Sequence, residues 1–141
     1  MRTLFFAVFL LIGIASGMQV PAHTATLEVQ LENYDPSSHT RFLEIVIPDH
    51  RYAFKQQLHL SASGYTSLTL ELDQTREVLI RYDLAELPVI LSPKGKASIS
   101  FHAADAKELA LSTRAIAQGS HAQTNQLIYT HYLWLRKLLE T

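Results

Sequence analysis

Cysteine is missing from this sequence of 141 residues. Its absence excludes a disulfide framework, a thiolate metal site, thiol–disulfide chemistry and a lipoprotein anchor on this chain. A basic stripe is missing as well, because 12 lysines and arginines are scattered among 13 acidic residues, for a net charge of -1. We therefore expect no nucleic-acid partner, since binding to phosphates requires clustered cations.

The N-terminus has the layout of a secretory signal peptide. A single charge, Arg2, precedes the apolar run "LFFAVFLLIGI" at residues 4–14, and small residues follow it. The run is shorter than the roughly 20 residues that span a bilayer. We expect residues 1–17 to be removed, with cleavage as late as residue 22 as the alternative. The mature protein is then periplasmic or secreted, without a stable membrane span.

From residue 24 onward, short segments alternate apolar and polar residues and are separated by turn signals. A period of two gives a strand one buried face and one solvated face. The spacing predicts a mainly β protein, an antiparallel β-sandwich over residues 24–117, rather than βαβ units. Residues 103–117 are compatible with a helix or with another strand. The strand segments are 25–31, 41–47, 52–60, 68–72, 78–82, 87–91 and 97–101.

Residues 118–141 predict a C-terminal amphipathic helix with a short linker. Ser120 and Gln123 have the spacing of a capping box, in which each side chain satisfies a backbone N–H of the other residue. The apolar stripe predicted to face the sheet includes His131, which is expected to be a packing residue. Its members are Leu127, Ile128, His131, Leu135, Leu138 and Leu139.

Histidine spacing argues against a metal site. The seven histidines include no pair spaced as zinc ligands are on one helix or one strand. His59 and His102 could meet across two strands, and with His131 they carry the weaker alternative of a metal-binding or hydrolytic site. We expect no metal and no cofactor.

Catalytic patterns are equally sparse. The sequence contains no Gly-x-Ser-x-Gly nucleophile elbow. Two carboxylate pairs, Glu71 with Asp73 and Asp83 with Glu86, lie at strand ends or on a solvated face rather than in a cleft. The segment "SPKGK", residues 92–96, predicts a hairpin turn with Gly95 as its turn glycine, because a strand pattern follows it. We therefore expect a protein without catalysis of its own.

Three aromatic residues of the final helix are candidate contact residues for a protein partner. Tyr129, Tyr132 and Trp134 would form an aromatic patch if exposed. The alternative is that they pack against the protein's own sandwich, as the apolar face of an amphipathic helix usually does.

The residues from 87 to 132 resemble a known domain. The segments "LSPKGKASISFHAAD" and "AIAQGSHAQTNQLIYTHYLWL" are similar to the N-terminal β domain that precedes the thioredoxin-like domain in TlpA/ResA-type proteins of Bacteroidetes. That domain has a Pro-Gly-Asp turn, then a strand, then a Gly-x-x-Ala-x-x-Asn segment, matched here by Gly119, Ala122 and Asn125. Lys94 is inserted in the turn, and Lys96 stands where the acidic residue would be.

The resemblance implies structural rather than catalytic roles at this junction. Gly119 would allow a tight turn, Ser120 would precede the helix, and Asn125 would tie the helix to the β body.

The family's redox chemistry belongs to a later Cys-x-x-Cys domain. Because this chain has no cysteine, two hypotheses remain. The first is an exported, non-catalytic module that binds or scaffolds a protein partner or linked domain at the cell envelope. The alternative is a truncated N-terminal part of a TlpA-like thiol–disulfide oxidoreductase.

Overall fold

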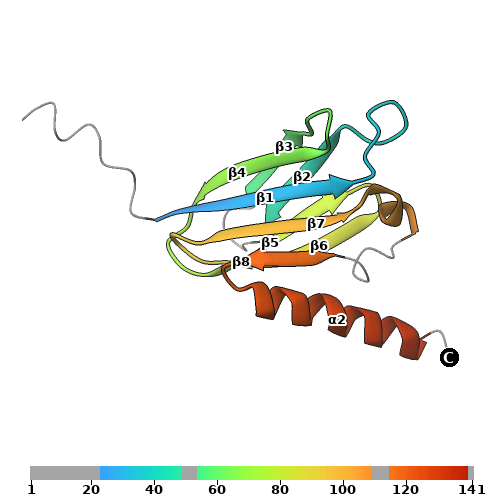
Figure 1. Cartoon of the computed structure of the whole chain (residues 1–141). Helices are drawn as coiled ribbons and strands as arrows, with labels where there is room; N and C mark the ends of the chain where they lie inside the picture. The colour runs from blue at the N-terminus through green and yellow to red at the C-terminus, as the bar shows by residue number, and fades with distance from the viewer. Residues whose placement is uncertain (1–22, 49–53, 109–114, 140–141) are drawn as a thin grey trace, which may run out of the picture.

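The computed structural model describes residues 23–48, 54–108 and 115–139, and side chains up to His131 in the last helix. The expected signal peptide therefore lies outside the described residues. Two four-stranded sheets pack face to face, with one long C-terminal helix along one side (Figure 1). The predicted β-sandwich with a C-terminal helix is confirmed.

The first sheet has the strand order β4-β1-β7-β8. It contains β1 (Thr24–Glu32), β4 (Tyr65–Glu71), β7 (Lys96–His102) and β8 (Ile116–Gly119). Neighbours are antiparallel except β1 and β7, which pair in parallel. The sheet is therefore mixed, whereas the sequence pattern predicted antiparallel pairing throughout.

The second sheet has the strand order β3-β2-β5-β6 and is wholly antiparallel. It contains β2 (Phe42–Ile47), β3 (Phe54–His59), β5 (Arg76–Tyr82) and β6 (Ala85–Leu91). A short 3-10 helix, η1 (Ala103–Glu108), follows β7, which settles part of the ambiguous stretch as helical. The last helix is α2 (Ala122–Leu139).

The core lies between the two sheets because each strand turns its apolar residues inward. On β1 the inward residues are Ala25, Leu27, Val29 and Leu31, none more than 1% exposed. The polar residues between them face solvent, as period-two alternation requires. Inward residues from the other strands complete the same cluster, among them Ile45, Ile80, Tyr82, Val89, Ile99 and Phe101.

The segment "SPKGK" makes a turn but not a hairpin. Gly95 donates its backbone N–H to the carbonyl of Ser92 at 2.9 Å. A Cβ at Gly95 would lie 2.9 Å from that same oxygen, so the turn has no room for a side chain. The turn joins β6 to β7, and these strands belong to different sheets. The hairpin prediction was wrong because local turn chemistry does not specify whether the next strand pairs or crosses over.

Candidate functional site

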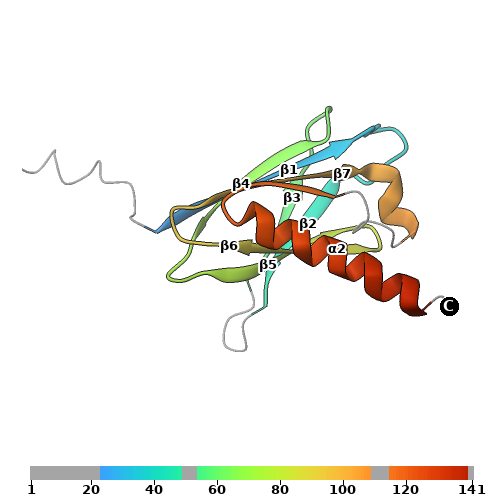
Figure 2. The same cartoon turned by 60° about the horizontal axis from the view of Figure 1, so that its bottom comes forward.

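A β-sandwich has two sheet edges on each side, and in this protein the two pairs of edges differ in what covers them. On one side are the edge strands β6 and β8, with α2 lying along them (Figure 2). On the other side are β3 and β4, joined by the short turn that follows β3. Exposed edges present unpaired backbone N–H and C=O groups that can pair with another chain.

The edge of β6 is capped by the side-chain amide of Asn125. The backbone N–H of Ile90 donates to Asn125 Oδ1 at 2.7 Å, and Asn125 Nδ2 donates to the Ile90 carbonyl at 3.2 Å. Asn125 is 0% exposed. Pro88, two residues earlier on the same edge, has no N–H to leave unpaired. The amide therefore takes the place of a neighbouring strand.

Gln126 does the same at the edge of β8. Its Oε1 accepts from the backbone N–H of Ala117 at 3.0 Å, and its Nε2 donates to the carbonyl of Ala115 at 3.1 Å. Two consecutive residues of α2 thus cap the edges of the two sheets. This side of the sandwich is closed to strand pairing at those positions.

The turn into α2 departs from the predicted capping box. Ser120 Oγ accepts from the backbone N–H of Lys96 at 3.2 Å, so it supports the end of β8 rather than the helix start. Gly119 has a φ of +88°, and a Cβ there would lie 2.2 Å from the Lys96 carbonyl oxygen. Both residues serve the junction of β7 with β8.

The predicted face of α2 was offset from the real one. Tyr129 is 0% exposed and Leu127 is 70% exposed, and His131 is exposed as well. Tyr129 is therefore a core residue and cannot be a contact residue for a partner, and His131 is not on the buried face. Burial raises the pKa of the Tyr129 hydroxyl. Tyr132 and Trp134 lie in α2, but their side chains are outside the described part of the chain.

The candidate catalytic and metal-binding groups are dispersed. His59 lies against the ring of Phe42 on the second sheet, with ring centroids 4.2 Å apart. His102 lies on the first sheet and bonds Asn33 at 2.9 Å. The two histidines, which could have met across two strands, do not do so, because β3 and β7 belong to different sheets. Within the described ranges, no three His, Cys, Asp or Glu side chains could together hold a metal ion.

Asp73, Asp83 and Glu86 of the acidic pairs each accept a hydrogen bond from another side chain. Asp73 accepts from Arg76 at 3.0 Å, and the hydrogen bond from Arg76 lowers the pKa of this carboxyl. Glu86 accepts from Arg81 at 2.7 Å, and Asp83 accepts from the hydroxyl of Thr40. Contrary to the sequence-based expectation, Glu71 and Asp73 also line a groove, which is described below.

The edge of β4 is open. Hydrogen bonds from Leu72 to the His23 carbonyl and from Leu31 to the Gly64 carbonyl fix which backbone groups face β1. In antiparallel pairing such groups alternate along the strand. The backbone N–H and C=O groups of Ser67, Thr69 and Glu71 therefore point away from β1, and no strand pairs with them in the described part of the chain.

The edge of β3 is open in the same way. The hydrogen bond from Leu60 to the Arg41 carbonyl sets the alternation against β2. The groups of Lys55, Gln57 and His59 then point outward, again with no strand beside them among the described residues. Sequence reasoning missed both edges. The available signal was the segment "YTSLTLE" of β4, which has no lysine or proline of the kind that protects a natural edge.

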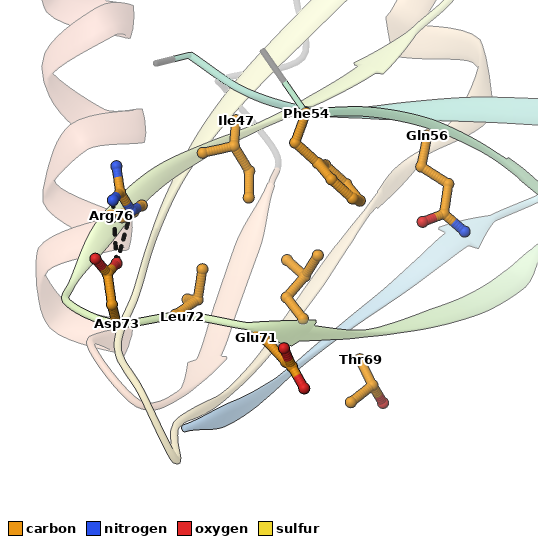
Figure 3. Close-up of a pocket in the computed structure, with 9 residues that line it drawn as sticks. Ile47, Phe54, Gln56, Thr69, Glu71, Leu72, Asp73 and Arg76 are labelled. Atoms are coloured by element: carbon orange, nitrogen blue, oxygen red, sulfur yellow. Dashed lines mark hydrogen bonds and ion pairs between the residues drawn. The ribbon is translucent and has the colours of Figure 1, made fainter. Parts of the chain in front are cut away.

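A groove of about 360 Å³ lies between the two open edges. Figure 3 shows Ile47 and Phe54 on one wall, facing Leu72 on the other, with the bonded pair Asp73 and Arg76 at one end. Phe54 is 37% exposed, although it sits at an inward position of β3. The remaining lining residues are Gln56, Thr69, Leu70 and Glu71. An apolar floor beside two unpaired edges can accept a side chain from an added strand. We call the open edges of β3 and β4 and this groove the open seam.

Proline substitutions distinguish a free edge from a paired one. At protein concentrations at which single chains prevail, we expect Thr69→Pro to be only slightly less stable than Thr69→Ala, because the N–H of residue 69 has no strand partner among the described residues of its own chain. Leu68→Pro should be about 3 kcal/mol or more less stable than Leu68→Ala, because the N–H of residue 68 pairs with β1. Urea unfolding of the four variants measures both differences. Equal proline penalties at the two positions would show that the assigned edge is wrong.

The outer face of the first sheet carries a charged group held by its neighbours. Glu28 bonds Lys96 Nζ at 2.8 Å and accepts from Ser98 Oγ at 2.9 Å. These hydrogen bonds, that from Lys96 first, lower the pKa of the Glu28 carboxyl. Because folding lowers this pKa, the contribution to stability is present above the ordinary pKa of glutamate and is lost as pH falls through the folded value.

An NMR titration of the Glu28 carboxyl tests this arrangement. We expect its pKa to lie below the usual range for glutamate in the wild-type protein and to rise toward that range in Lys96→Met. Ser98→Ala should produce a smaller rise, since it removes the second hydrogen bond. An unchanged titration in Lys96→Met would contradict the assignment.

Comparisons of this chain with protein-family models, with curated proteins and with solved structures found no match. The resemblance to the domain that precedes thioredoxin-like domains therefore stays a prediction. Among the described residues, no helix is both long enough and apolar enough to cross a bilayer.

Proposed function

We propose that this chain is an exported, non-catalytic β-sandwich module of the cell envelope that binds a protein partner by strand addition at the open seam. The observation that carries the proposal is the contrast between the two sides of the sandwich. One side has its edges capped by Asn125 and Gln126, while the other leaves the edges of β3 and β4 without strand partners in the described chain.

Three features support strand addition. Backbone groups of three residues on β4 point outward in a row, so an extended segment can form a regular ladder with them. The strand carries no proline and no lysine, and its one charged residue, Glu71, lies at its end. The groove beside it offers apolar contacts from Ile47, Phe54 and Leu72 to an inward-pointing side chain of the added segment.

The absence of cysteine from the whole sequence supports a role without thiol chemistry. The signal-like N-terminus supports export. The resemblance supports the non-catalytic part of the proposal, because it implies a β domain that stands apart from the catalytic domain.

The proposal is tested by the size of the native assembly. We expect the protein in extracts of its own cell envelope to migrate as a complex larger than one chain. Thr69→Pro should shift it to the size of one chain, because proline removes an edge N–H and its ring obstructs the added strand. Thr69→Ala, which keeps the N–H, is the matched control and should retain the complex. A complex that survives Thr69→Pro would refute binding at this edge.

A further inference from the structure

Among the described residues, three on each edge of the open seam have outward-pointing backbone groups and no strand beside them. On β4 they are Ser67, Thr69 and Glu71, and on β3 they are Lys55, Gln57 and His59. Their side chains lie on the outer faces of their sheets, because each is at a position that alternates with an inward residue. The open seam of one chain therefore offers two different edges, that of β3 and that of β4.

These two edges fit each other in antiparallel register. If Glu71 of one strand lies opposite Lys55 of the other, Thr69 lies opposite Gln57 and Ser67 opposite His59. Every outward-pointing residue then meets another, and a hydrogen-bonded antiparallel pair exchanges two backbone hydrogen bonds. A register shifted by one residue would place outward-pointing groups against groups that are already paired.

Charge favours the same register. It sets the exposed carboxylate of Glu71 against the ammonium of Lys55, which is 65% exposed and also bonds Glu44 at 2.5 Å. Opposite charges on directly facing residues stabilise a strand pair, and like charges destabilise it. No pair in this register places two acidic or two basic residues against each other.

The strand directions allow a second copy to supply the complement. β3 ends and β4 begins at the same end of the sandwich, joined by a short turn (Figure 1). The two strands therefore run in opposite directions. Rotating a copy by a half-turn about an axis parallel to the strands places its β3 beside β4 of the first chain, antiparallel, and its β4 beside β3 of the first chain. This is a closed, isologous arrangement.

We propose that the partner at the open seam is a second copy of this chain, and that the two copies pair seam to seam. Each β4 adds to the partner's β3, so that the first sheet of one chain continues into the second sheet of the other. Residues at the groove, among them Phe54 and Leu72, would then be enclosed against their counterparts. This inference rests on the proposed function and names its partner.

The register is tested by cysteine pairs in a chain that has no cysteine of its own. In the double variant Lys55→Cys with Glu71→Cys, the facing Cα atoms should be about 5.5 Å apart across the junction, within the range of a disulfide. We expect mild oxidation to give a covalent dimer on a non-reducing gel. The control pair His59→Cys with Glu71→Cys is out of register and should stay monomeric, as should each single variant.

The mass of the purified, processed protein in solution provides the second readout. We expect twice the mass of one chain by light scattering, a shift toward one chain in Glu71→Lys, and recovery of the dimer in Glu71→Lys with Lys55→Glu. A wild-type protein with the mass of one chain, or equal crosslinking of the two cysteine pairs, would overturn the inference. If the wild type is monomeric alone but still forms a complex in the cell that Thr69→Pro abolishes, the dimer fails while the proposed function stands.

Discussion

Replacing Asn125 with leucine should lower the free energy of unfolding by up to about 6 kcal/mol, because it leaves two partly buried backbone groups of Ile90 without partners, and such a loss costs about 1–3 kcal/mol for each group that is buried. Leucine has a similar size, so the loss reports the hydrogen bonds rather than a cavity. The residue is 0% exposed, and water cannot replace the amide without opening the contact between α2 and β6.

Urea unfolding followed by circular dichroism measures this loss. Gln123→Leu, at an exposed position of the same helix turn, is the matched control and should change stability little. Gln126→Leu should have an intermediate effect, because the Gln126 side chain is only partly buried, whereas Asn125 is 0% exposed. If Asn125→Leu were as stable as Gln123→Leu, the amide would not be the device that closes this side of the sandwich.

Gly119→Ala is the second large loss that we expect. A residue other than glycine at positive φ costs about 1–2 kcal/mol, and forcing an extra carbon into a packed site costs about 1–3 kcal/mol more. Here φ is +88°, and the new Cβ would lie 2.2 Å from a backbone carbonyl oxygen of β7, which cannot rotate away as a side chain could.

Gly95→Ala is the matched control for Gly119→Ala. Its Cβ would also be close to a backbone oxygen, at 2.9 Å, but the position does not have a positive φ. We therefore expect a smaller loss of stability at Gly95, measured by the midpoints of thermal unfolding. Equal midpoints for Gly119→Ala and the wild type would show that the junction of β8 with α2 can relax around a side chain.

The strands were predictable from the sequence because each buries one face, so that apolar and polar residues alternate along it. β1, β2, β5 and β7 begin and end close to where the alternation does. The assignment of strands to sheets was not predictable in this way. The parallel pairing of β1 with β7, and the separation of β6 from β7 into different sheets, depend on long-range packing that local periodicity does not record.

The buried face of α2 was mispredicted for a specific reason. A stripe chosen by apolar character omits Asn125, a polar residue that is buried and hydrogen-bonded to the backbone of β6. It includes Leu127, which is 70% exposed. The resemblance did assign Asn125 a role in tying the helix to the β body, and the two hydrogen bonds with Ile90 give that tie its geometry.

The open seam could be found only by comparing edges. Nothing in the segment "YTSLTLE" states that it lies at the edge of a sheet, since a central strand can have the same alternation. Its status follows from the strand order, which leaves β4 with β1 as its sole neighbour among the described strands. Once the strand order is known, the absence of lysine and proline from β4 becomes informative, because an edge strand without them is able to pair.

Site-specific photo-crosslinking in the native cell envelope tests the central claim most directly. A photoreactive amino acid placed at Ser67 lies on the open edge strand β4, and one placed at Gln118 lies on β8, whose edge Gln126 covers. The account predicts a discrete protein adduct from position 67, to a second copy or to another protein, and none from position 118. Adducts of equal yield from both positions, or an adduct from position 118 alone, would contradict the claim that the open seam is the binding surface.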